Sequence, residues 1–173
     1  IKDVCRDTLY QKVSYNTQNQ VFMEDTIRNN IRLYRSMKNE KYDEIIKATY
    51  IDEVLRKNHM QDNAMLSFKG DPLSSGECQM VSFASALYED KQLMLMDESF
   101  SAVDPAKETS FFLSLQKLAR CGKTIILVSH RLINIELADV ILFMDQGQIC
   151  ESGSFKQLIS NQNEFYEWYV RQA

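Results

Sequence analysis

The sequence predicts a mixed α/β fold in which a parallel sheet carries an inserted helical segment. Helical patterns lie before or after most of the predicted strands, and such alternation is typical of parallel sheets. Between Asp25 and Glu89 no strand-like run occurs, and the apolar residues follow helical spacing instead. The predicted strands are short apolar runs of the kind found in buried strands, at residues 13–15, 93–96, 124–128 and 140–144.

The other predicted elements follow in chain order. Pro105 suits the first turn of a helix, and apolar residues recur at helical spacing from there to Gly122. Residues 145–148 predict a turn that leads into a short strand, and two helical stretches come after it. We therefore predict a core lobe and a helical lobe, formed respectively by residues 1–23 with 90–173 and by residues 24–89.

Composition excludes several classes of protein. The chain has 173 residues, of which 45% are apolar and 25% charged, and its formal net charge is −4. This charge gives no electrostatic reason to expect nucleic acid. The longest apolar run, residues 140–144, is far shorter than the ~20 residues that cross a bilayer. The four cysteines are too widely separated for a metal-ligand pair.

Two adjacent carboxylates, Asp97 and Glu98, follow the predicted strand at residues 93–96. Open α/β sheets bind ligands at the carboxyl ends of their strands. There, one carboxylate can hold Mg²⁺ through water, while the next orients or deprotonates an attacking water. The alternative is that this pair merely begins a loop.

Two further segments are candidates for phosphate binding. Ser74, Ser75 and Gly76 precede a helical run, and the free N–H groups and positive dipole of a helix N-terminus suit a phosphate. An ordinary serine cap is the alternative. His130 follows the strand at residues 124–128, where its ring could reach a terminal phosphate or serve a structural role.

Taken together, these segments resemble the nucleotide-binding domain of ABC transporters. The stretches at 24–31 and 151–153 are similar to the exporter branch of that family. Five motifs occur in the family's order: a Q-loop at 13–20, the signature at 70–77 (GDPLSSGE), Walker B at 93–98 (LMLMDE), a D-loop at 101–104 (SAVD) and the switch histidine at 128–131 (VSHR).

The resemblance implies a P-loop NTPase (RecA-like) core with an inserted α-helical signature subdomain, and ATP and Mg²⁺ as its ligands. By this resemblance, Asp97 and Gln18 would hold Mg²⁺, and Glu98 would polarise the attacking water. His130 would contact the γ-phosphate. Gln18 would also couple the nucleotide site to a transmembrane partner.

The resemblance also implies that two such domains meet head to tail. The signature residues would bind the γ-phosphate of a nucleotide that the opposite subunit holds, and the D-loop residues would cross the dimer interface. The signature residues are Ser74, Ser75, Gly76 and Glu77, and the D-loop residues are Ser101 and Asp104.

The family's function would be ATP hydrolysis that drives export, at the cytoplasmic face of a membrane. The implied partners are a transmembrane domain of the same transporter, fused upstream, and a second nucleotide-binding domain. One alternative is a module that dimerises in response to nucleotide without turnover. Another is a chromosome-maintenance or repair ATPase. The C-terminal lobe of such a protein also lacks the phosphate loop, but it has no Q-loop, whereas this chain has a Q-loop-like segment.

Three departures from the family pattern stand out. No Walker A motif, G-x-x-x-x-G-K-[ST], occurs, because Lys117 stands where Gly122-Lys123-Thr124 would need a glycine. We expect about seventy residues to precede Ile1, and the chain alone to be inactive and, with two strand edges exposed, poorly stable.

The Q-loop and the signature also depart from the pattern. Without a gap, Thr17 stands at the usual glutamine position, one residue before Gln18. Ser75 replaces a glycine of the usual signature, and Glu77 replaces a glutamine. At ~8 Å from a phosphate and an effective dielectric of about 20, the Glu77 charge would cost about 2 kcal/mol per phosphate charge.

Overall fold

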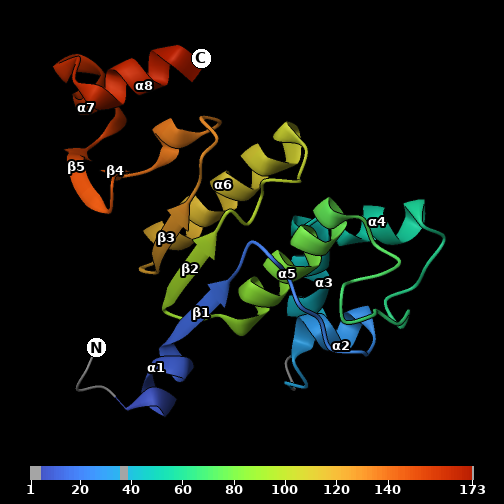
Figure 1. Ribbon diagram of the computed structural model, residues 1–173. Helices are drawn as coiled ribbons and strands as arrows, with labels where there is room; N and C mark the ends of the chain where they lie inside the picture. Colours follow the sequence, from blue (N-terminus) through green and yellow to red (C-terminus); the bar gives the residue numbers. More distant parts are fainter. Residues whose placement is uncertain (1–4, 36–38, 173) are drawn as a thin grey trace. The chain divides into compact units, whose positions relative to one another are not determined.

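The computed structural model describes residues 5–35 and 39–172, which belong to two compact units (Figure 1). The first unit is Ile1–Ser129 and the second is His130–Ala173. Helices α2 to α5 belong to the first unit together with the parallel sheet. The division into a core lobe and a helical lobe stays a prediction.

The first unit contains a three-stranded parallel sheet in the order β1-β2-β3. This arrangement confirms the predicted α/β class. Because the strands are parallel, their carboxyl ends meet at one edge, where Asn16 is opposite Met96 and Asp97 is opposite Val128. The strands are β1 (Val13–Asn16), β2 (Leu93–Asp97) and β3 (Thr124–Val128).

Two helices flank these strands in the chain. Helix α1 (Arg6–Lys12) leads directly into β1, and α6 (Pro105–Arg120) connects β2 to β3. The Asp104 carboxylate caps α6 by accepting a 3.0 Å hydrogen bond from the Lys107 amide, and Pro105 occupies the first helical position. Proline is favoured there because its fixed φ suits a helix and its missing N–H has no partner in any case.

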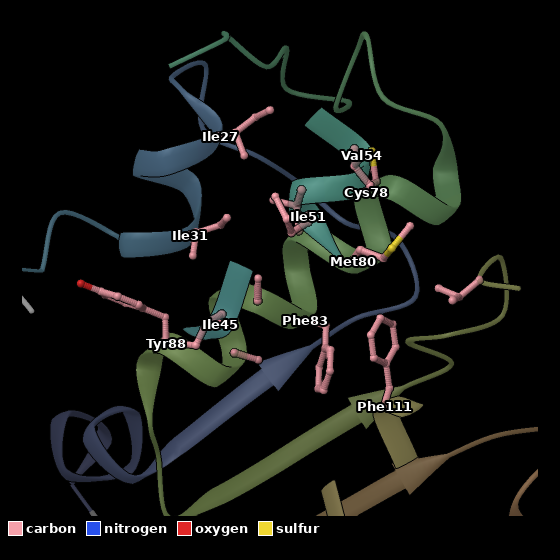
Figure 2. Packing of buried hydrophobic residues seen from close by; sticks show 14 of the residues in the cluster. Ile27, Ile31, Ile45, Ile51, Val54, Cys78, Met80, Phe83, Tyr88 and Phe111 are labelled. Carbon is pink, nitrogen blue, oxygen red and sulfur yellow. The ribbon is translucent and has the colours of Figure 1, made fainter. Parts of the chain in front are cut away.

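Among the described residues between β1 and β2 there are four helices, of which α5 is the most deeply buried. Both α2 and α3 pack on α5, and α5 also contacts β1. On α5, the centroid of the Phe83 ring lies 4.8 Å from that of Phe111 on α6, and Figure 2 shows these two rings side by side. The four helices are α2 (Ile27–Arg32), α3 (Asn39–Ala48), α4 (Ile51–Lys57) and α5 (Ser75–Glu89).

The aromatic contacts join α5 to the chain that follows β2. The Phe100 ring lies 5.1 Å from Phe83, edge to face, and 5.3 Å from Phe111. Each such pair contributes about 0.5–1.5 kcal/mol beyond the area that it buries. The helix that carries the predicted signature is therefore held firmly beside the segment that carries the predicted Walker B carboxylates.

The second unit contains an antiparallel hairpin rather than a further parallel strand. The strand predicted at residues 140–144 forms β4, which pairs with β5. The alternation with helices favoured a parallel strand, but the turn decides the pairing, because Gln146 and Gly147 both have positive φ, at 44° and 77°. Two such residues form the turn that suits a tight hairpin. The elements are η1 (Ile135–Leu137), β4 (Ile141–Asp145), β5 (Gln148–Gly153), α7 (Phe155–Asn161) and α8 (Glu164–Gln172).

The second unit has an apolar core of its own, in which Ile141, Leu158 and Phe165 are buried. The Glu151 carboxylate accepts a 2.7 Å hydrogen bond from the Phe165 amide and so fixes the first turn of α8 on β5. Ser154 caps α7 through a reciprocal capping box with Gln157. Across residues 5–35 and 39–172, no helix is both long and apolar enough to cross a membrane.

Candidate functional site

The carboxyl edge of the parallel sheet gathers the predicted Walker B residues. Asp97 ends β2, and Glu98 follows it with a left-handed φ of 45°. The Glu98 amide donates a 3.0 Å hydrogen bond to the Val128 carbonyl, which extends the β2–β3 ladder by one residue. A non-glycine residue in this region of φ costs roughly 1–2 kcal/mol. Such a conformation persists where surrounding contacts fix it, and it is frequent in functional sites.

Gln18 reaches this edge from the segment after β1. Its Nε2 donates a 2.7 Å hydrogen bond to Oε2 of Glu98. Thr17, the other candidate for this position, instead donates its hydroxyl to the Asn19 carbonyl at 2.8 Å and forms a local turn. The structure thus brings Gln18, rather than Thr17, to the Glu98 carboxylate.

The donors at this edge are chemically suited to Mg²⁺. Asp97 supplies a half-buried carboxylate. The side-chain nitrogen of Gln18 donates to Glu98, and its side-chain carbonyl oxygen can serve as a second oxygen ligand for a cation. Mg²⁺ prefers such oxygen ligands and usually takes one or two carboxylates together with substrate phosphates and waters. Within the described residues, no group of three or more His, Cys, Asp or Glu side chains could hold a metal by itself.

The N-terminus of α5 is built by a capping box. Ser74 caps the helix, and its hydroxyl lies 3.4 Å from the Glu77 amide. In return, Oε2 of Glu77 accepts 2.8 Å hydrogen bonds from the amide and the hydroxyl of Ser74. This box ties up the Glu77 amide, while Ser75 stays exposed at the helix tip. The first-turn N–H groups of a helix are the ones that have no partner within it.

Glu77 is held as a buried, charged carboxylate. Its Oε1 accepts hydrogen bonds from Lys57 Nζ at 2.9 Å and from Asn58 Nδ2 at 3.1 Å. Burial opposes the charged form, but hydrogen bonds from Ser74, Lys57 and Asn58 outweigh burial and lower the pKa of Glu77 to about 2. The Lys57 ammonium, largely exposed, balances the charge that would otherwise repel a phosphate.

A cavity of about 430 Å³ opens at this helix tip. The Glu77 and Lys57 side chains contribute to its wall. Gly76 lies against the D-loop, and a Cβ added there would come within 2.4 Å of the Ala102 carbonyl oxygen. Only glycine allows this approach. The cavity is lined by Glu53, Val54, Lys57, Ser74, Ser75, Gly76, Glu77, Met80, Ala102, Val103, Asp104 and Lys107.

Comparison with protein families identifies the family of this chain. The ABC transporter family model matches residues 1–101, more than half of the chain. The chain belongs to the ABC transporter family.

Relatives of this ABC transporter chain include several exporters. An export ATP-binding/permease protein of Rickettsia felis is 35% identical over 161 residues, which cover 92% of the chain and 28% of the relative. The beta-(1→2)glucan export ATP-binding/permease protein NdvA of Bartonella bacilliformis is 30% identical over 173 residues, 99% of the chain and 29% of the relative. The chain therefore spans less than a third of the length of these relatives.

A solved structure supports the same assignment. A bacterial Atm1-family ABC exporter with ATP bound matches with a TM-score of 0.90 and 29% sequence identity. The match covers 100% of this ABC transporter chain and 30% of the exporter chain. The incomplete P-loop NTPase fold expected from the sequence agrees with this match.

The remaining predicted residues lie in two places. Ser101 and Asp104 are exposed on the D-loop, and both are occupied within the chain, since Ser101 Oγ accepts from Gln79 and Asp104 caps α6. His130 is the first residue of the second unit. Its predicted contact with a terminal phosphate stays a prediction, as do the roles of the other site residues.

Sequence reasoning missed two groups of this ABC transporter site. Lys57 and Asn58, at the end of α4, hold the Glu77 carboxylate, but they lie about twenty residues before it in the chain. Gln79, three residues after Gly76, contacts the D-loop directly. The signal for Gln79 was a polar residue between apolar residues on a buried helix, since buried polar side chains need partners.

Proposed function

We propose that this chain supplies the Walker B, Q-loop, signature and D-loop parts of a domain that hydrolyses ATP to drive export. The observation that carries this proposal is the hydrogen bond from Gln18 to Glu98 at the carboxyl edge of the sheet. This edge is where open α/β sheets bind ligands. The family assignment and the exporter relatives support the same conclusion.

Glu98 is the residue that orients and polarises the attacking water. Its carboxylate is oriented by the Gln18 amide, and its main chain is fixed by the bond to Val128. A carboxylate within reach of a water can accept that water's proton as the nucleophile attacks the γ-phosphorus. His130 would contact the γ-phosphate and stabilise its charge.

Asp97 and Gln18 would hold Mg²⁺, Asp97 through a water. When bound, the cation would neutralise charge that develops on the phosphate oxygens. Gln18 would thus contact both the metal ion and Glu98, the residue that polarises the attacking water. The segment that contains Gln18 would couple this site to a transmembrane partner.

The tip of α5 would bind the γ-phosphate of ATP held by a second domain. Ser75 is exposed there, the 15-residue helix directs its positive end outward, and the cavity beside it is lined by the D-loop. Glu77 would act here mainly by holding Ser74 and the first turn. Two domains would meet head to tail, with Ser101 and Asp104 at their interface.

The transmembrane partner would belong to the same transporter. The two export relatives are named ATP-binding/permease proteins, and both are more than three times as long as the part aligned here. A domain that uses ATP would lie on the cytoplasmic face of the membrane.

Steady-state ATP hydrolysis by the full-length protein in lipid vesicles tests this function. Glu98→Gln should lower kcat at least a hundredfold. Glu44→Gln, an exposed glutamate on α3, is the matched control and should leave kcat unchanged. A wild-type protein that binds Mg-ATP and dimerises without hydrolysing it would instead indicate a regulatory module without turnover.

A further inference from the structure

We propose that Gln79 is a positioning residue that fixes the D-loop and the Glu98 main chain to the signature helix, an inference that rests on the proposed function. Gln79 lies on α5 and is only 4% exposed. Its Oε1 accepts a 2.8 Å hydrogen bond from the Ala102 amide. Its Nε2 lies 3.0 Å from Ser101 Oγ and 3.5 Å from the Glu98 carbonyl oxygen.

The partners of Gln79 demand a carboxamide. The Ala102 amide donates to Gln79 and the Glu98 carbonyl accepts from it, and a carboxamide offers the matching acceptor and donor on one planar group. A carboxylate would retain the acceptor and lose the donor, and a leucine of similar size would lose both. Leucine would therefore take the side-chain acceptor away from the Ala102 amide and remove one of the two donors to the Glu98 carbonyl oxygen, the other being the Ser101 amide.

Gly76 makes the same connection one helical turn earlier. Residues three apart on a helix lie on one face, so Gly76 and Gln79 both face Ala102. Gln79 binds the Ala102 N–H, while the absence of a Cβ at Gly76 makes room for the Ala102 carbonyl oxygen. The signature helix therefore fixes the positions of both the N–H and the carbonyl oxygen of Ala102.

This connection continues to the catalytic carboxylate. The Glu98 carbonyl oxygen accepts hydrogen bonds from the Ser101 amide at 3.3 Å and from Gln79 Nε2 at 3.5 Å. Only three residues separate Glu98 from Ala102, and Glu98 has the left-handed φ of 45° that neighbouring contacts must maintain. A shift of the D-loop would therefore turn the Glu98 main chain and misdirect its carboxylate.

In the proposed function, Gln79 links two sites that serve different nucleotides. Glu98 would act on the ATP of its own domain, while the tip of α5 would bind the ATP of the opposite domain. Because Gln79 holds Glu98 in register with that helix, its loss should slow the chemical step more than it weakens ATP binding. A merely structural role would not separate kcat from KM in this way.

The test compares Gln79→Leu, Gln79→Glu and wild type in the full-length protein, by kcat and KM for Mg-ATP and by hydrogen exchange of the peptide that contains Ala102. Gln79→Leu should lower kcat at least tenfold, keep KM within twofold and speed exchange at least tenfold. Gln79→Glu should retain slow exchange but not recover kcat, because its carboxylate faces the Glu98 carbonyl oxygen. The control is Gln92→Leu, the same substitution at an exposed glutamine that donates to the Gly122 carbonyl away from the D-loop, and it should match wild type.

Either of two results in the Gln79→Leu protein would overturn the proposal. One is a Gln79→Leu protein with kcat and Ala102 exchange within twofold of wild type. The other is a raised KM at unchanged kcat, which would make Gln79 a binding residue. If Gln79→Leu does not fold, Gln79→Glu decides, and a wild-type kcat in that variant would overturn the proposal. If the wild type shows no hydrolysis, the proposed function fails, and Ala102 exchange alone decides whether Gln79 positions the D-loop.

Discussion

The side-chain amide of Gln18 donates a 2.7 Å hydrogen bond to the Glu98 carboxylate, across eighty residues of sequence. The parallel pairing of β1 with β2 makes this contact possible, since Asn16 and Met96 lie opposite each other just before the two segments. One side chain from the Q-loop thus sets the orientation of the predicted catalytic carboxylate. Changes at Gln18 should therefore affect the chemistry that we propose for Glu98.

Replacing Gln18 with alanine should lower kcat for ATP hydrolysis by about tenfold to a hundredfold. A hydrogen bond to a charged group is worth about 1.5–3 kcal/mol, and about 1.4 kcal/mol corresponds to tenfold in rate. Steady-state ATPase assays of the full-length protein measure this change. The control is Gln20→Ala, whose side chain donates to the Thr17 carbonyl instead of to Glu98. Equal activity in the two variants would show that the Gln18 contact does not serve catalysis.

Replacing Gly76 with alanine should destabilise the protein by about 1–3 kcal/mol. In an ordinary helix this substitution is stabilising by about 1 kcal/mol. Here the sign reverses, because the new Cβ would come within 2.4 Å of a backbone oxygen, Ala102 O, which belongs to a clamped loop. Urea denaturation measures the change, with Ser85→Ala on the same helix as the control. A Gly76→Ala protein as stable as wild type would mean that the D-loop moves away at little cost.

The free energy of unfolding should depend on the charge of Glu77 at acidic pH. The folded-state pKa of about 2 lies below the ordinary glutamate pKa of 4.5, so the ionised carboxylate stabilises the fold above pH 4.5. This contribution is lost as pH falls from about 4.5 toward 2. At pH 7 the free energy of unfolding of wild type should exceed that of Glu77→Gln by on the order of 2 kcal/mol.

Chemical denaturation of both proteins between pH 7 and pH 3 checks this dependence. The difference in stability between wild type and Glu77→Gln should shrink steadily below pH 4.5. In the control variant, Glu44→Gln, the difference from wild type should stay small at every pH, because Glu44 is exposed on α3. A constant difference between wild type and Glu77→Gln would show that the Glu77 charge contributes nothing to folding.

The sequence predicted those features that depend on local pattern. Apolar runs located all three parallel strands, and the acidic pair after β2 located the carboxyl edge of the sheet. The signature serine was predicted either as a helix cap or as a phosphate ligand, and the structure places Ser74 as the cap. These predictions succeeded because strand burial and helix capping are encoded by residues close together in the chain.

The features that were missed depend on contacts between distant segments. The pairing of β4 with β5 was missed because an apolar strand reads alike in a parallel and an antiparallel sheet. The charge of Glu77 was expected to oppose phosphate, but Lys57 and Asn58 on another helix surround it. The link from Gln79 to Ala102 likewise crosses from α5 to a loop that local sequence does not place beside it.

The most direct test of the account is the identity of the nucleotide recovered from the full-length Glu98→Gln protein after incubation with Mg-ATP. If Glu98 activates the attacking water, the variant retains bound ATP uncleaved, whereas wild type under the same conditions yields ADP and phosphate. Recovery of ADP from Glu98→Gln at the wild-type rate would contradict the account, because the water would then be activated by another group.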